Sequence, residues 1–152
     1  MEKLKVGDRI PKFKTVNQHD EPVSSGDLKG KKTVLFFYPK DDTPTCTKEA
    51  CNLRDNHERL IAAGYTVYGI SPDSSKRHRK FIEKHSLPYD LLVDEDHSMA
   101  EAFGVWGEKS MYGRTYMGIL RTTFILNEKG VITEVIEKVK AAEHADQILW
   151  TD

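Results

Sequence analysis

The most continuous apolar stretch of the chain, Thr33–Tyr38, contains only β-branched, aliphatic and aromatic residues. Such a run is typical of a strand buried on both faces. A second run at 65–71 and a short one at 91–93 predict two further strands. Between the first two runs the apolar residues follow helical spacing, which predicts a helix at about 44–63 that ends at Gly64.

The remaining segments are predicted from shorter signals: helix caps, turn residues and the alternation of apolar and polar positions. The N-terminal part is predicted to hold a small hairpin or extended arm within 7–30. The middle part is predicted to hold a helix from Ser74 or Ser75 to His85, a helix at 98–103 and an ordered loop at 104–120 with four glycines. A strand hairpin at 121–126 and 131–135 and a final helix at about 142–150 follow. Strands that alternate with helices indicate an α/β fold, here with a mixed central sheet, flanking helices and an N-terminal hairpin extension. Because no repeat or linker interrupts the pattern, residues 1–152 are predicted to form a single domain.

Composition excludes several classes of function. With 38% hydrophobic and 31% charged residues, the chain is an ordinary globular sequence, and its net charge of −1 favours neither nucleic acid nor a membrane surface. No apolar run approaches the roughly 20 residues that span a bilayer, and the N-terminus lacks the apolar core of a signal peptide. A reducing, cytoplasmic setting is therefore expected. The basic run 76–80 is interpreted as a solvated helix face and not as a nucleic-acid site.

Both cysteines lie in the segment that follows the first strand, at positions 46 and 51. Thr43 is the predicted N-cap of the next helix, and Pro44 falls at its first position, where a missing N–H costs nothing. Cys46 then lies in the first helical turn, near unpaired N–H groups and the positive end of the helix dipole. This position favours the thiolate, which is the reactive form of cysteine.

Cys51 follows five residues later on the same predicted helix. An intact helix separates the two Cα atoms by about 8.5 Å, whereas a disulfide needs them within about 7 Å. The pair can therefore bond only if part of the helix unwinds. This geometry suits two cysteines that meet during a reaction cycle and argues against a permanent structural bridge.

Three other roles for the cysteine pair fit the residues less well. A zinc site needs four ligands, usually in short paired spacings, and the remaining candidates are six scattered histidines, so no metal is expected. A disulfide-exchange protein would more naturally show two intervening residues between its cysteines. An inert buried pair fits Cys51 better than Cys46, since the Thr-Pro cap places Cys46 at a helix terminus.

The spacing of Pro39, Thr43 and Cys46 resembles the active-site signature of the peroxiredoxins, and the run 40–51 is similar to the bacterioferritin comigratory protein (PrxQ) branch of that family. Further similarity covers nearly the whole chain: 6–8, Pro11, Phe13, 68–71, 112–113, 117–118, Arg121, 123–124 and the helix that holds His144. Thr45 stands where this branch usually has Gly, and a β-branched residue stiffens the backbone there. The resemblance implies a thioredoxin-like fold and a thiol peroxidase that needs no metal, haem or nucleotide.

The resemblance also implies roles for the site residues. Cys46 would be the peroxidatic cysteine, which attacks hydrogen peroxide or an organic hydroperoxide and becomes a sulfenic acid, and Cys51 would resolve it as an intrachain disulfide. Thr43 would hold the reacting atoms through its hydroxyl, Pro39 would shield the pocket, and Arg121 would stabilise the developing charge. A thioredoxin-like dithiol would reduce the disulfide, and a monomer would suffice. A thiol redox sensor read by a partner protein remains the alternative.

The sequence also predicts the surroundings of Glu49 and of three aromatic residues. Glu49 lies one turn after Cys46 and is expected to repel its thiolate unless it is paired, with Arg121 or surface Lys48 as the partner, or exposed to solvent. The aromatic residues Trp106, Tyr112 and Tyr116 either line the peroxide entrance or pack under the 104–120 loop. The sequence assigns no role to His57 or His144.

Overall fold

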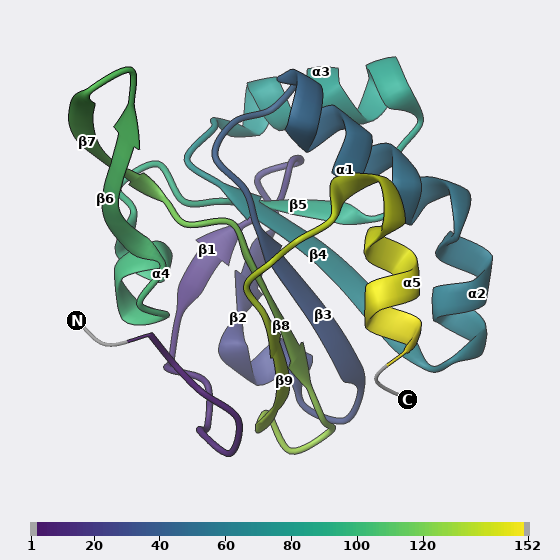
Figure 1. Cartoon of the computed structure of the whole chain (residues 1–152). Coiled ribbons are helices and arrows are strands. Elements are labelled where there is room, and N and C mark those ends of the chain that lie inside the picture. Colours follow the sequence, from purple (N-terminus) through teal and green to yellow (C-terminus); the bar gives the residue numbers. More distant parts are fainter. Residues whose placement is uncertain (1–2, 151–152) are drawn as a thin grey trace.

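The computed structural model describes residues 3–150, and its elements follow the predicted order of strands and helices (Figure 1). In chain order they are β1 (Lys14–Val16), β2 (Pro22–Ser24), η1 (Ser25–Leu28), β3 (Lys32–Phe37), α1 (Pro44–Asp55), α2 (His57–Ala62), β4 (Tyr65–Ser71), α3 (Ser75–His85), β5 (Asp90–Val93), α4 (Ser98–Ala102), β6 (Trp106–Met111), β7 (Arg114–Ile119), β8 (Thr122–Leu126), β9 (Ile132–Ile136), η2 (Ala141–Glu143) and α5 (His144–Leu149). The predicted α/β class, the N-terminal hairpin β1–β2 and the hairpin β8–β9 are confirmed.

The central sheet has five strands in the order β5-β4-β3-β8-β9, with β3 in the middle. Strand β3 pairs in parallel with β4 and antiparallel with β8, so the sheet is mixed as predicted. Helical connections join the parallel strands β3, β4 and β5, as a parallel crossover requires. The carboxyl end of β3 therefore lies next to the start of β8, where Phe37 pairs with Thr122.

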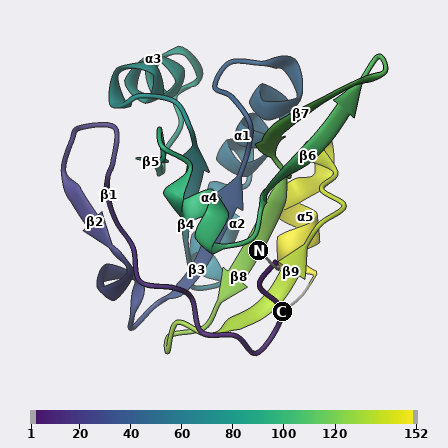
Figure 2. The same ribbon diagram turned by 90° about the vertical axis from the view of Figure 1, so that its left-hand side faces the viewer.

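Both faces of the sheet are buried, which explains the uninterrupted apolar run in β3. Val34 and Phe36 point to a core shared with α1, α2, α3 and α5, whereas Leu35 and Phe37 point to a second core shared with α4 and the N-terminal hairpin. Figures 1 and 2 show these two layers on opposite sides of the sheet. Gly69 in β4 is required by close packing, because a Cβ there would lie 2.7 Å from carbon atoms of Leu91 and Phe36.

The predicted loop at 104–120 is wrong, because most of it forms the β6–β7 hairpin that projects from the body (Figure 2). The glycines that suggested a loop have specific places in it. Gly107 pairs with Gly118 across the two strands. Tyr112 and Gly113 both have positive φ, 52° and 79°, and form the two-residue turn that favours such a hairpin.

Two predicted helices are divided. The helix predicted at 44–63 breaks at Asn56 (φ −111°, ψ 13°) into α1 and α2, and the final helix begins as η2 before Glu143 (φ −133°, ψ 20°) starts α5. Neither break is marked by Gly or Pro, the strongest local signals of a helix end. Within residues 3–150, no helix combines the length and apolar character needed to span a bilayer.

Candidate active site

Cys46 lies in the first turn of α1. This helix is the next element after β3 (Figure 1). As predicted, Pro44 is the first helical residue and Thr43 is the N-cap. The Thr43 hydroxyl makes no capping bond, however, and instead donates to the Lys40 carbonyl oxygen at 2.9 Å. Cys46 is nevertheless buried: its side chain is only 2% exposed and belongs to the core beneath α1.

Arg121 supplies the polar contact to this buried sulfur. It directly precedes β8, and its Nη2 donates to Cys46 Sγ at 3.1 Å. Its other terminal nitrogen, Nη1, donates to Glu49 Oε1 at 2.6 Å. The planar guanidinium fork thus joins a thiol and a carboxylate from the same face of α1. Of the expectations for Glu49, the pairing with Arg121 is confirmed, and solvent exposure is wrong because Glu49 is fully buried.

The charges in this cluster are strongly coupled. Burial raises the pKa of Glu49 to about 7, against the opposing attraction of Arg121. Burial alone would lower the pKa of Arg121, but its partners Glu49 and Cys46 outweigh this and raise it. Arg121 therefore stays cationic beside Cys46, whereas Glu49 carries a proton over part of the neutral range.

Cys51 lies on the same helix as Cys46, half-buried, and both thiols are free. The next residue, Asn52, fixes this part of α1 to the C-terminal segment: its Oδ1 accepts from Ala145 N–H and its Nδ2 donates to the Ala142 carbonyl, both at 2.8 Å. Between the cysteines, Glu49 of α1 contacts His144 of α5, with 3.4 Å between Glu49 Oε2 and His144 Nε2. Pro39 is half-buried at the start of the loop that links β3 to α1.

His144, to which the sequence assigned no role, is fully buried behind Glu49. Its Nε2 lies 2.7 Å from Thr123 Oγ1 and 3.4 Å from Glu49 Oε2, and its Nδ1 lies 2.9 Å from Gln147 Oε1. Sequence reasoning missed these neighbours because they come from three elements that meet only in the folded chain. The one local signal is the three-residue spacing of His144 and Gln147 on α5.

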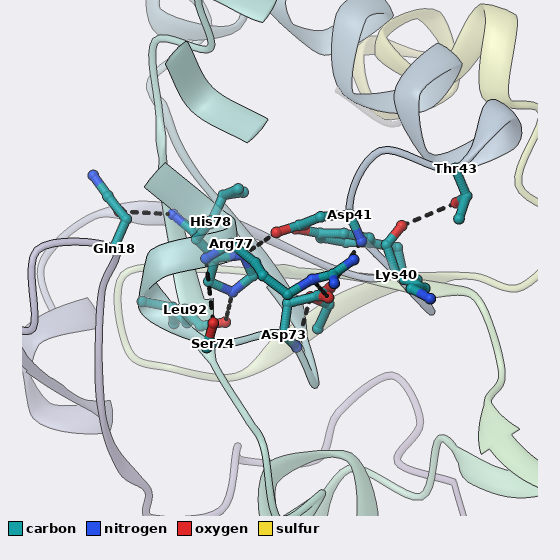
Figure 3. Close-up of polar contacts among 12 residues, drawn as sticks. Gln18, Lys40, Asp41, Thr43, Asp73, Ser74, Arg77, His78 and Leu92 are labelled. Atoms are coloured by element: carbon teal, nitrogen blue, oxygen red, sulfur yellow. Dashed lines mark hydrogen bonds and ion pairs between the residues drawn. The ribbon is translucent and has the colours of Figure 1, made fainter. Parts of the chain in front are cut away.

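The loop that carries Pro39 and Thr43 is held by a buried network around Asp41 (Figure 3). Asp41 accepts from Tyr38 O–H at 2.5 Å and from His78 Nδ1 at 2.6 Å, while its own N–H donates to Asp73 at 2.7 Å. His78 Nε2 faces the Leu92 carbonyl oxygen at 2.9 Å. Both ring nitrogens of His78 therefore have a hydrogen-bond partner, and the His78–Asp41 contact is buried.

Replacing His78 by Phe is expected to lower the free energy of unfolding by about 3–5 kcal/mol, because it leaves the buried Asp41 side chain without its His78 partner. The matched control is Lys84→Ala, which breaks the exposed Lys84–Asp42 pair between the same loop and the same helix α3. Exposed pairs contribute about 0–1 kcal/mol. Urea denaturation of the reduced protein measures both changes, and equal small losses would contradict the role given to the buried pair.

The remaining candidates are the aromatic residues of the β6–β7 hairpin, the basic run on α3 and a group of possible metal ligands around His78. Tyr112 is 98% exposed at the tip of the β6–β7 hairpin, so packing beneath a loop is wrong for it, and Trp106 stacks on His97. The basic run on α3 is solvated as predicted, except for buried His78. Asp41, Asp73 and His78 bring metal-ligand atoms within 4.8 Å of one another, but hydrogen bonds within the network already account for that arrangement.

Comparisons with known proteins agree with this geometry. The sequence model of the AhpC/TSA family matches residues 6–135. Peroxiredoxin Bcp of Bacillus subtilis is 45% identical over 148 residues, which cover 97% of this chain and 94% of that protein. A cysteine mutant of PrxQ from Xylella fastidiosa superposes with a TM-score of 0.91 at 29% identity, covering 98% of this chain and 95% of that one.

A further structure, of the bacterioferritin comigratory protein from Xanthomonas campestris, superposes with a TM-score of 0.85 at 34% identity and covers 91% of this chain and 88% of that one. It was described in relation to alkyl peroxide reduction by that protein. These similarities confirm the expected thioredoxin-like α/β fold.

Proposed function

The chain belongs to the AhpC/TSA family, in the bacterioferritin comigratory protein branch of the peroxiredoxins, which are thiol peroxidases, and we propose that Cys46 is the cysteine that attacks the peroxide. The observation that carries this proposal is the 3.1 Å contact from Arg121 Nη2 to Cys46 Sγ in the first turn of α1. The guanidinium and the helix N-terminus both favour the thiolate over the thiol.

In the proposed first step, the Cys46 thiolate attacks one oxygen of the peroxide and the O–O bond breaks. The sulfur becomes a sulfenic acid, and the leaving oxygen takes a proton to give water or an alcohol. Arg121 stabilises the negative charge that moves onto this oxygen. Thr43 has to turn its hydroxyl from the Lys40 carbonyl toward the pocket to hold the peroxide, and Pro39 shields the site without adding an N–H.

In the proposed second step, the Cys51 thiol condenses with the sulfenic acid of Cys46 to form an intrachain disulfide and water. Since both cysteines lie on α1, the turns between them have to unwind. Unwinding breaks the 2.8 Å bond from Tyr89 O–H to the Ala50 carbonyl and removes Glu49 from Arg121. Thr45 lies exposed in the first turn, where its β-branch raises the cost of this change relative to Gly.

The third step of the proposed cycle is reduction of the disulfide by a thioredoxin-type dithiol, which becomes oxidised in exchange. Unwinding of α1 exposes the disulfide to this partner. Because attack and resolution use one chain, a monomer in a reducing, cytoplasmic setting suffices for the cycle.

The proposal is tested on the wild-type protein in two stages. Reduced protein mixed with limiting hydrogen peroxide or an alkyl hydroperoxide should lose both thiols, and mass spectrometry of a digest should find residues 46 and 51 linked. Thioredoxin with its reductase should then support continuous peroxide consumption. A disulfide that forms but is not recycled would indicate a redox sensor instead, and unchanged thiols would overturn the assignment of Cys46.

A further inference from the structure

One oxygen of the buried Glu49 side chain has no hydrogen-bond partner among the described residues. Oε1 accepts from Arg121, but Oε2 makes no hydrogen bond and lies 3.4 Å from His144 Nε2. A buried carboxylate oxygen without a hydrogen-bond partner keeps its full desolvation penalty, so ionised Glu49 beside a neutral ring is an unfavourable arrangement. One additional proton between Glu49 Oε2 and His144 Nε2 would remove this unfavourable arrangement.

The neighbours of His144 fix how its ring is protonated. Gln147 Oε1 accepts from Lys140 N–H at 2.9 Å, and Gln147 Nε2 donates to the Lys138 carbonyl at 2.9 Å, so the orientation of this amide is set by the backbone. His144 Nδ1 faces the Oε1 atom and therefore carries a hydrogen. In a neutral ring, Nε2 is consequently a bare acceptor directed at Thr123 and Glu49.

The number of protons on Glu49 and His144 determines how strongly the positive charge of Arg121 acts on the Cys46 sulfur. The titratable and charged groups that face this cluster from its surrounding elements are Cys46 and Glu49 of α1, Arg121 before β8, Lys109 of β6, Tyr89 before β5 and His144 of α5. If Glu49 is ionised and the His144 ring is neutral, the negative charge of Glu49 offsets the positive charge of Arg121. If they carry one, the pair is neutral and the charge of Arg121 acts on Cys46.

We propose that Glu49 and His144 jointly hold one buried proton while Cys46 is ionised, and that His144 is thereby a positioning residue for the peroxidatic thiolate. The inference rests on the proposed role of Cys46 and adds a function for the C-terminal helix α5. Burial lowers the pKa of His144 to about 4 and raises that of Glu49 to about 7, so the proton resides mainly on the carboxyl. The two groups titrate as one coupled unit.

The test measures the ionisation of Cys46 in a Cys51→Ser background, by ultraviolet thiolate absorbance and by alkylation rate as functions of pH. His144→Gln places an amide donor near Oε2, which stabilises the Glu49 carboxylate and lets the proton leave. The negative charge of Glu49 then offsets the positive charge of Arg121, and the thiolate fraction of Cys46 at neutral pH should fall about tenfold. His57→Gln, a half-buried histidine on α2, is the matched control and should change nothing.

A double-mutant cycle separates this mechanism from a structural role. In Glu49→Gln the side chain is permanently neutral, so adding His144→Gln should leave Cys46 ionisation unchanged. An equal shift in both backgrounds, or no shift in either, would overturn the proposal. None of these measurements uses peroxide, so a wrong assignment of the peroxidase cycle would appear separately as an inactive wild type.

A second measurement needs no substitution of His144 and so does not depend on the folding of that variant. Infrared and isotope-edited NMR spectra of reduced wild-type protein report where the proton lies, with Glu49→Gln identifying the carboxyl band. A protonated Glu49 carboxyl or a doubly protonated His144 ring at neutral pH supports the proposal. An ionised Glu49 beside a neutral ring while Cys46 is a thiolate would refute it.

Discussion

Peroxide consumption is expected to disappear when Cys46 is replaced by Ser, and recycling of the protein by thioredoxin is expected to disappear when Cys51 is replaced by Ser. A serine hydroxyl is far less nucleophilic than a thiolate, and the contact with Arg121 cannot ionise it at neutral pH. Cys51→Ser keeps the Cys46–Arg121–Glu49 arrangement, so the first oxidation should proceed at the wild-type rate. Stopped-flow mixing with peroxide measures the first step, and a thioredoxin-coupled assay measures recycling.

The products distinguish the two variants further. Cys51→Ser should accumulate sulfenic acid at Cys46 and, with excess peroxide, the over-oxidised forms. The chain has no third cysteine, so no other thiol of the same molecule can resolve it. Normal recycling of Cys51→Ser by thioredoxin would show that the reductant attacks the sulfenic acid directly and that Cys51 is not the resolving residue.

The parts of this site that lie close together in the sequence were predictable from it. The strand at 33–38, the cap at Thr43 and the placement of Cys46 in the first helical turn all follow from local residue preferences, and the structure has them as expected. Arg121 could be singled out because a charge stands at the start of an apolar strand. Its pairing with Glu49 was one of several options, and only the β3–β8 register brings the two together.

What the sequence did not predict depends on contacts between distant elements. The Thr43 hydroxyl bonds to the Lys40 carbonyl instead of the helix, and the side chains of Asp41 and His78 form a buried contact across two elements. A histidine in a basic run looks solvent-exposed until the helix packs on the sheet. The glycines within 104–120 weaken the strand signal and so favour a loop, whereas in the structure the positive φ of Gly113 makes the turn of the β6–β7 hairpin.

Replacing Arg121 by Met is expected to slow the oxidation of Cys46 by peroxide about 10²–10³-fold, the usual effect of removing one donor that stabilises transition-state charge. Arg121→Lys should recover only part of the loss, since an ammonium cannot hold Cys46 Sγ and Glu49 Oε1 in one planar fork. Stopped-flow oxidation of Cys46 in the Cys51→Ser background measures the second-order rate constant for each variant.

The loss should occur without unfolding, because Glu49 can respond to the missing cation by keeping its proton, toward which burial already shifts it. Lys109→Met is the matched control: it removes a nearby cation of the β6–β7 hairpin that acts on Cys46 through its charge and makes no hydrogen bond to the sulfur among the described contacts. The control should change the rate only a few-fold, since a partly exposed charge is screened. If Arg121→Met reacts as fast as Lys109→Met, the guanidinium acts only through its charge, and the direct contact with the sulfur has no part in catalysis.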